Sequence, residues 1–309
     1  MINRNLLIAL MLCLIFVTAG FKPAAGQQAF VEPDYFKQDV AAGNLPPVAA
    51  RVPQQPFIVA LNDEAKKTGR YGGTMRILGG RAKDIRLMVV YGYARLVGYN
   101  KEMKIVADIA HSVDVEEQRI FTFHLREGHR WSDGHPFTTE DFRYYWEDIA
   151  SNPEASRMGL PQELLVDGQP PKVDIIDALT VRYSWSRPNP FFLPALAGAR
   201  PIYIFRPAHY LKQFHPAYTD TKIIKNKVKE LGQRNWVSLH FFHDRPYKNN
   251  NPDRPSLQPW VLKTPPPSDR FIFERNPYYH RIDAQGNQLP YIDKVAMTIA
   301  SAKLIPAKA

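Results

Sequence analysis

The sequence predicts a mixed α/β fold, because strand patterns with a period of two stand on both sides of a helix pattern with a period of 3.6. Phenylalanine recurs at every second position at 121–123 and at 271–273, whereas residues 142–149 place apolar side chains at helical spacing. The composition supports a packed core, since 45% of the 309 residues are hydrophobic and 12% are aromatic. This length suits one large domain or two ordinary ones. The 27 prolines predict long ordered loops and modest helix content.

Residues 1–26 have the pattern of an export signal peptide. A short polar and positive start precedes the apolar run Leu6–Val17, which is too short to span a bilayer comfortably. Small residues follow, so we predict cleavage after Gly26 and a periplasmic mature protein; the alternative is an uncleaved anchor. Cys13, the only cysteine, lies inside the apolar run, so the mature chain would contain none.

The mature chain opens with an amino-terminal arm, residues 27–70, rich in proline, alanine and glutamine. Its prolines predict an extended segment in which helices are broken. Tyr71 then opens the first strand, Met75–Leu78, which the glycine pair at 79–80 ends. The run Met88–Val97 is apolar and aromatic, and its pattern does not decide between a buried helix and a strand.

The clearest local signal is a strand, a turn and a capped helix between residues 119 and 152. Apolar and polar residues alternate over 121–125, the period of a half-buried strand. Thr138 and Asp141 have the spacing of a capping box. One helical face follows, made of Phe142, Tyr145, Trp146 and Ile149.

The remaining elements are short and separated by proline-rich loops. We predict a strand at Leu179–Trp185, a short helix at Phe191–Ala197, a loop at 249–267, a strand at Arg270–Arg275 and a final strand or strand pair at Leu289–Ile299.

A basic insertion is predicted at residues 222–254. Residues 200–254 hold eleven lysines and arginines against four acidic residues, and several of the lysines share one helical stretch. A solvated charged face is the ordinary interpretation of such a run. The formal net charge of +10 is a mild excess over 309 residues and is not concentrated as in most nucleic-acid-binding proteins, so we expect no nucleic-acid partner.

No set of residues in the sequence assembles into a catalytic site. His240 and His243 have the spacing of a metal pair on a helix, but no third ligand accompanies them. The histidines at 124, 129 and 135 are interpreted as ordinary surface imidazoles, and Asp133 as a turn residue. We therefore expect no catalytic residue, no metal and no cofactor.

Six segments are more specific than these patterns. They are Tyr71-Gly-Gly-Thr, Val106-Ala-Asp-Ile-Ala, Phe121-Thr-Phe-His-Leu-Arg-Glu-Gly, Trp131-Ser-Asp-Gly-His-Pro-Phe-Thr-Thr-Glu-Asp-Phe, Phe273-Glu-Arg-Asn-Pro-Tyr-Tyr and Leu289-Pro-Tyr-Ile-Asp-Lys-Val. In this order they resemble the extracellular solute-binding proteins of family 5, the oligopeptide, dipeptide and nickel receptors of ABC importers.

The resemblance implies a two-lobed α/β clamshell that encloses its ligand and performs no covalent chemistry. Residues 71–299 would form the first lobe, with an inserted subdomain at about 89–178. Residues 300–309 would be a truncated exit towards a second lobe that is missing here. The implied partners are a peptide or similar small solute and an ABC permease in the cytoplasmic membrane, and the implied state is a monomer.

Ligand contacts are expected at the carboxyl end of the first strand, since open α/β sheets bind ligands there. The resemblance adds the region just after the capped helix. The candidate ligand-binding residues are Arg81, Lys83, Asp84, Met88, Arg157 and Met158. The alternative for Arg81 and Lys83 is an ordinary surface charge.

Two other functions remain open from the residues alone. One is an exported metal-dependent hydrolase that uses His240 and His243. The other is a surface protein that binds anionic partners through the insertion at 222–254.

Overall fold

The computed structural model describes residues 29–61, 67–157 and 159–301. The predicted signal peptide, Met158 and residues 302–309 lie outside these ranges. Within them, no helix is both long enough and apolar enough to cross a membrane.

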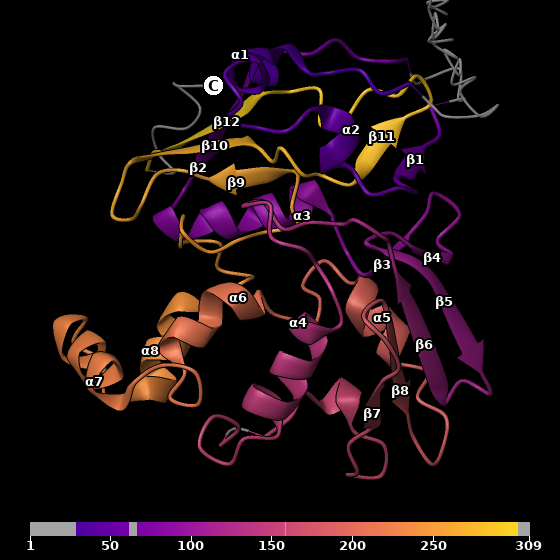
Figure 1. The fold of residues 1–309 in the computed structure, drawn as a ribbon, viewed down its shortest axis with the longest axis vertical. Coiled ribbons are helices and arrows are strands. Elements are labelled where there is room, and N and C mark those ends of the chain that lie inside the picture. The colour runs from indigo at the N-terminus through magenta and orange to yellow at the C-terminus, as the bar shows by residue number, and fades with distance from the viewer. Residues whose placement is uncertain (1–28, 62–66, 158, 302–309) are drawn as a thin grey trace, which may run out of the picture.

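The upper half of Figure 1 is a four-stranded sheet with the order β2-β12-β10-β9. Its strands are β2 (Thr74–Gly79), β12 (Lys294–Ile299), β10 (Arg270–Arg275) and β9 (Trp260–Leu262). β2 runs parallel to β12, and the other pairs are antiparallel. The strands predicted at Met75–Leu78 and Arg270–Arg275 are confirmed. The loop predicted at 249–267 is wrong where it contains β9, a three-residue strand too short to show a period.

An upper core packs between this sheet and the segment that follows β2. That segment is the 3₁₀ turn η2 (Ala82–Arg86) and helix α3 (Leu87–Gly92), which Figure 1 places directly below the sheet. The upper core consists of Ile85, Met88, Leu262, Phe271, Phe273, Val295 and Met297. Phe271 and Phe273 are fully buried, as the alternation predicted.

The lower right of Figure 1 holds an antiparallel sheet with the order β5-β6-β8-β7. Its strands are β5 (Ala110–Glu116), β6 (Ile120–Leu125), β8 (Thr180–Ser184) and β7 (Lys172–Ile175), and the hairpin β3 (Val97–Tyr99) and β4 (Ile105–Ala107) leads into it. Helix α5 (Phe192–Ala197) and the 3₁₀ turn η4 (Gln162–Leu164) accompany the sheet. The expected strand at 179–185 and helix at 191–197 are confirmed.

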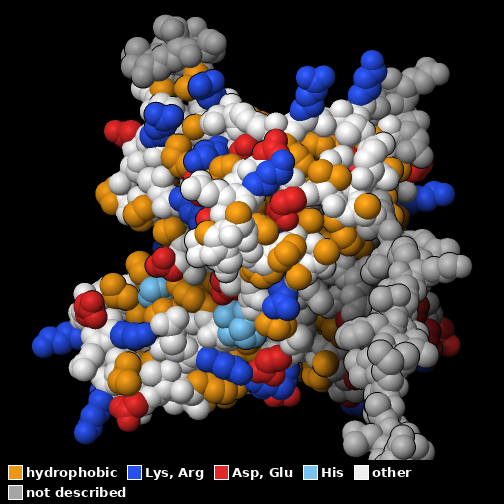
Figure 2. Space-filling view, turned by 45° about the horizontal axis from the view of Figure 1, so that its top comes forward, with side chains coloured by type: hydrophobic (Ala, Val, Ile, Leu, Met, Phe, Trp, Pro, Cys, Tyr) orange, Lys and Arg blue, Asp and Glu red, His pale blue; other side chains and the backbone are white. Residues whose placement is uncertain are grey.

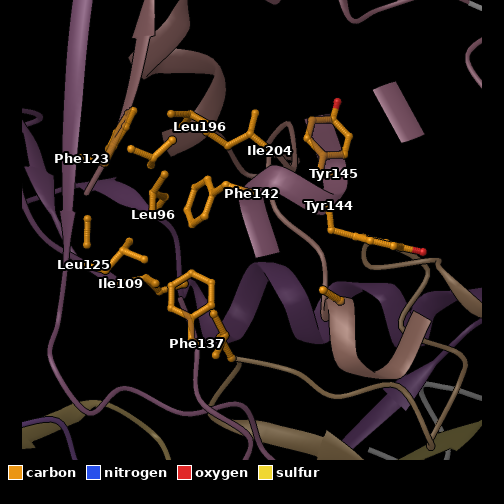
Figure 3. Close-up of a cluster of buried hydrophobic side chains, with 14 of the residues drawn as sticks. Leu96, Ile109, Phe123, Leu125, Phe137, Phe142, Tyr144, Tyr145, Leu196 and Ile204 are labelled. Atoms are coloured by element: carbon orange, nitrogen blue, oxygen red, sulfur yellow. The ribbon is translucent and has the colours of Figure 1, made fainter. Parts of the chain in front are cut away.

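The capped helix is present but changes its winding. It begins as α4 (Glu140–Arg143) and continues as a π-helical segment, Tyr144–Ala150. Tyr144 is also fully buried, because its ring packs against His215, Tyr218 and His240 from the short helices and the loop between them. Figure 3 shows the resulting lower core, in which Phe142 faces Phe123 from the sheet and Leu196 from α5.

Asp141 fixes the start of this helix. Its carboxylate accepts the indole N–H of Trp131 at 3.0 Å, the backbone N–H of Thr138 at 3.2 Å and that of Ala208 at 3.0 Å. Burial raises the pKa of the Asp141 carboxyl to about 7, against these donors, which lower it. The Thr138–Asp141 contact realises half of the predicted capping box.

The left of Figure 1 carries a group of short helices. They are α6 (Ala208–Leu211), η5 (Lys212–Phe214), α7 (Thr221–Glu230) and α8 (Trp236–His243). α7 carries the lysines of the predicted helical stretch, and its Asp220 cap accepts the Lys222 backbone N–H at 2.7 Å.

The amino-terminal arm is less extended than predicted. It contains η1 (Asp34–Phe36), α1 (Lys37–Ala41), α2 (Val48–Arg51) and β1 (Phe57–Val59), and β1 pairs in parallel with β11 (Arg281–Asp283). Helix α2 starts directly after Pro47, because proline is tolerated ahead of the first turn, where its missing N–H has no partner to lose.

A buried charged junction joins the two halves. The Asp108 carboxylate accepts the His280 Nε2–H at 2.8 Å and two N–H groups of Arg281, at 2.9 and 2.6 Å. It also accepts the Arg95 backbone N–H at 2.9 Å. Asp108 comes from the segment between β4 and β5, whereas His280 and Arg281 lie at β11. The junction therefore ties the lower sheet to the upper half.

Candidate functional site

The loop that follows β2 is stabilised by a carboxylate that lies within it. The Asp84 carboxylate accepts the Arg81 backbone N–H at 2.9 Å, which closes the first turn of η2. Ile85 turns into the upper core, while Arg81 and Lys83 stay exposed. The loop therefore presents basic side chains on a rigid turn, and Asp84 acts as its cap.

Met88 takes a different place from the one expected of a ligand contact. It is 2% exposed and packs in the upper core. It supports the loop from beneath and offers no side-chain surface to a ligand.

A hollow of about 360 Å³ opens beside η2. It is lined by Ala82, Lys83, Ile85, Arg86, Lys248, Asn250, Pro266 and Phe271. Three of these residues are basic and none is acidic. The apolar lining residues reduce the contact of the charged groups with water, and electrostatic interactions are stronger in such surroundings than in bulk water.

Two further hollows adjoin the first. One, of about 310 Å³, shares Arg86 and Lys248 with it and adds Arg200 and Arg245. The third hollow, of about 610 Å³, shares Arg245 and Lys248 with the second and extends along α8 to Arg157. Because each hollow shares lining residues with the next, we call the three together the basic groove. Lys83 lines its first hollow and Arg157 its last.

The basic groove has a strongly one-sided charge. Its basic residues are Lys83, Arg86, Arg157, Arg200, Arg234, Arg245 and Lys248. Within the described ranges, none of these seven forms an ion pair with an acidic side chain. The two acidic lining residues are engaged elsewhere: Glu154 accepts the Trp236 indole N–H at 2.6 Å, and Asp244 is buried in ion pairs.

Asp244 anchors the segment that carries Arg245 and Lys248. It ends α8, and its fully buried carboxylate pairs with Arg206 and with Arg254, the latter at 3.1 Å. Burial alone would raise the pKa of Asp244, but the two guanidinium groups hold it below its ordinary value. Arg206 and Arg254 therefore neutralise the negative charge of Asp244 inside the protein, and the lining of the basic groove remains predominantly positive.

The histidine pair at 240 and 243 lies on helix α8 but forms no metal site. The Nε2 atom of His240 bonds with the Tyr144 hydroxyl at 2.8 Å, and the His243 ring stacks on Phe214 with centroids 3.8 Å apart. Burial lowers the pKa of both imidazoles to about 4. In the part of the chain the structure describes, no group of three or more potential ligands is arranged to hold a metal.

The three histidines considered together in the sequence, 124, 129 and 135, have different partners in the structure. His124 contacts Asp114 at 2.8 Å, His129 lies buried beside His280, and His135 stacks on His209. The expectation of a surface imidazole is wrong for His129, which is 2% exposed. Asp133 is the turn residue expected, since its carboxylate accepts the His135 backbone N–H at 3.1 Å.

Sequence reasoning missed most of the groove. Arg86, Arg200, Arg245 and Lys248 come from three separated segments, and only the tertiary fold brings them to one hollow. The one available signal is the excess of basic residues at 200–254, which does not by itself show that Arg200, Arg245 and Lys248 lie beside Arg86.

The fold is shared with a known class of receptors. The model of a family described as bacterial extracellular solute-binding proteins, family 5, middle region, matches residues 104–304. The chain belongs to this family. The resemblance noted in the sequence motifs is therefore confirmed, and so is the fold class.

Two curated relatives illustrate the likeness. The periplasmic alpha-galactoside-binding protein of Rhizobium meliloti is 29% identical over 289 residues, which cover 85% of this chain and 38% of the relative. The periplasmic oligopeptide-binding protein OppA of Salmonella typhimurium is 26% identical over 197 residues, which cover 60% of this chain and 30% of the relative.

Solved structures agree. An oligopeptide-binding protein OppA matches with a TM-score of 0.78 at 33% identity, covering 90% of this chain and 42% of that one. The periplasmic binding protein MelB from Agrobacterium fabrum, in complex with stachyose, matches with a TM-score of 0.66 at 26% identity, covering 88% and 41%.

The family and the relatives that match this chain are solute-binding proteins and not enzymes. The chain spans between 30% and 42% of the length of these four relatives.

Proposed function

We propose that this chain is the solute-binding component of an ABC importer and that the basic groove forms one wall of its ligand cleft. The observation that carries the proposal is the position of the groove: it begins at the loop after β2 and ends at Arg157, the two regions expected to meet a ligand. Closure of an opposing wall over the bound solute would shift the receptor towards a closed state that the permease accepts.

Each candidate residue has a separate role in this proposal. Lys83 and Arg157 contact the solute, and Arg81 contributes an exposed charge at the rim. Asp84 holds the loop and Met88 supports it. Met158 belongs to the same region, outside the described residues.

The solute is proposed to be a peptide or a short oligosaccharide. The relatives support both, since OppA is named for oligopeptides, the Rhizobium meliloti receptor is named for alpha-galactosides, and MelB is in complex with stachyose. The groove suits either: polar groups beside η2 can meet a peptide main chain, and the exposed rings of Phe241 and Phe242 offer flat apolar faces to a sugar.

Ligand-observed NMR on the 309-residue chain tests the proposal, because saturation transfer detects the millimolar affinity expected of a single wall. The probes are trialanine and raffinose, both free of side-chain charge. We expect transfer from at least one of them, reduced by Phe242→Ala and unchanged by Ile223→Ala on the exposed face of α7. The proposed function would be contradicted if neither probe, nor any of the charged solutes named in the next section, showed saturation transfer.

We further propose that residues 71–299 form a first lobe with an insertion at about 89–178, and that the protein acts as a monomer. We also propose that the chain is exported and cleaved after Gly26. The family is described as extracellular, which supports export. Intact-mass measurement of protein recovered from the periplasm checks the cleavage: the mass should lack residues 1–26, and retention of the leader would contradict the proposal.

A further inference from the structure

The charge of the basic groove differs from the ordinary basic surface of this protein. Figure 2 shows lysines and arginines scattered over one face, interleaved with apolar and acidic side chains. On α7, Lys222, Lys225 and Lys229 likewise stand exposed on one helix. In the basic groove, by contrast, seven basic residues from separate segments line connected hollows.

Two residues that line the first hollow each have a side-chain polar atom that is buried without a partner. These atoms are the Nε of Arg86 and the side-chain oxygen of Asn250. A buried polar atom that makes no hydrogen bond is destabilising, so a partner for the polar groups of these two residues would stabilise the site. An anionic oxygen that enters the hollow would accept an N–H of the Arg86 guanidinium, and a hydroxyl or amide N–H of the same solute would lie beside Asn250.

The surroundings strengthen an anion at this point. Lys83 and Lys248 line the same hollow, and Phe271, Ile85 and Pro266 form its apolar lining. A guanidinium that is partly removed from water and flanked by two ammonium groups binds a carboxylate or phosphate more strongly than it binds a neutral group. No acidic residue lines this hollow to compete for these cations.

We propose that the groove selects anionic solutes, and that the carboxylate or phosphate of the solute sits between Arg86, Lys83 and Lys248. This inference rests on the proposed function, since it names the class of solute for the same cleft wall. It assigns the apolar and aromatic stretch along α8 to the uncharged part of the solute.

Matched solute pairs test the inference on the 309-residue chain. The peptide pair is Ala-Glu-Ala and Ala-Gln-Ala, both acetylated at the amino end and amidated at the carboxyl end so that the glutamate carboxylate is the only charge, and the sugar pair is galactose 6-phosphate and galactose. Affinities come from NMR titration in 50 mM and 300 mM NaCl. The charged member of at least one pair should bind about tenfold more tightly at the lower salt, and the difference should shrink at the higher salt. The pair that shows the difference identifies whether the anion is a carboxylate or a phosphate.

Variants locate the effect. Arg86→Gln and Lys248→Gln should each weaken the charged member by roughly tenfold and leave the neutral member unchanged. Lys222→Gln on α7 removes the same charge away from the groove and should change neither. Lys248 is exposed, so its variant keeps the test valid even if Arg86→Gln disturbs the fold.

The outcomes separate the two proposals. Equal affinity for both members of each pair, or a loss as large in Lys222→Gln as in Lys248→Gln, overturns the anion selectivity while the proposed solute binding stands. If no member of either pair binds and the neutral probes fail as well, the proposed function falls and the inference with it.

Discussion

Asp244 shows how a single buried residue shapes the candidate site. Its carboxylate is fully buried between Arg206 and Arg254 and ends the helix that leads into Arg245 and Lys248. Removing one partner of a buried ion pair leaves the other charges uncompensated. We expect Asp244→Asn to lower the free energy of unfolding by about 3–5 kcal/mol, measured by urea denaturation followed by circular dichroism.

The matched control is Asp34→Asn. Asp34 pairs with Lys37 on the surface, where both side chains are more than half exposed. Its loss should change the free energy of unfolding by at most about 0.5 kcal/mol. Similar losses in the two variants would mean that the Asp244 ion pairs do not hold the segment in place.

His240 gives the protein a pH dependence of known sign. It is 1% exposed, and burial lowers the pKa of its imidazole to about 4, which outweighs the opposite effect of Asp244. The unfolded chain takes up this proton near pH 6.5, so it binds more protons than the folded protein between pH 6.5 and 4. The free energy of unfolding must therefore fall as the pH decreases through this window.

The test compares wild type with His240→Gln, whose amide can still bond with Tyr144. Between pH 7 and pH 4.5 the wild type should lose about 2 kcal/mol more stability than the variant, measured by urea denaturation at each pH. Carboxylates that titrate in the same range are present in both proteins and cancel in the comparison. Parallel pH profiles would show that His240 titrates in the folded protein as it does in the unfolded chain.

At the scale of elements, the strands with strong alternation were predictable and the short or irregular ones were not. β10 follows its apolar period because one face packs against a core, and β6 does so except at Thr122, which is buried as well. β9 has three residues and no period, and the π-helical winding of Tyr144–Ala150 leaves no mark in the sequence. The candidate site has the same limit. The loop after β2 is predictable because a glycine pair ends the strand locally, whereas only the tertiary fold brings Lys248 to that loop.

The alternation in β10 makes a quantitative prediction. Phe273 is fully buried in the upper core, and Ile272, one position earlier, points to the other face and is only partly buried. Phe273→Ala should lower the free energy of unfolding by about 3–5 kcal/mol, because it leaves a cavity. Ile272→Ala should lower it by only about 1 kcal/mol. Equal losses, measured by urea denaturation, would place β10 in a different register from the one in the structure.

At the scale of the whole molecule, the two larger cores of the described residues are joined by a buried charged junction. The upper core lies against the β2-β12-β10-β9 sheet, and the lower core lies between the β5-β6-β8-β7 sheet and the helices. Asp108 accepts hydrogen bonds from His280 and Arg281 across the junction. Burial would raise the pKa of Asp108, but Arg281 and His280 reverse this and hold the pKa far below its ordinary value. The carboxylate therefore stays charged at neutral pH.

This junction should make the two cores unfold together. Four of the five tryptophans, 131, 146, 185 and 236, belong to the lower core, so fluorescence reports mainly on that half, while circular dichroism reports on both. In the wild type the two urea transitions should coincide. In Asp108→Asn, Arg281 loses its buried anion, and we expect the free energy of unfolding to fall by about 3–5 kcal/mol and the two transitions to separate.

The control is Asp114→Asn, which removes a half-exposed contact with His124 and should leave the two transitions coincident. Coincident transitions in Asp108→Asn would mean that apolar packing alone couples the halves, and that the wall of the proposed cleft is held without the charged junction.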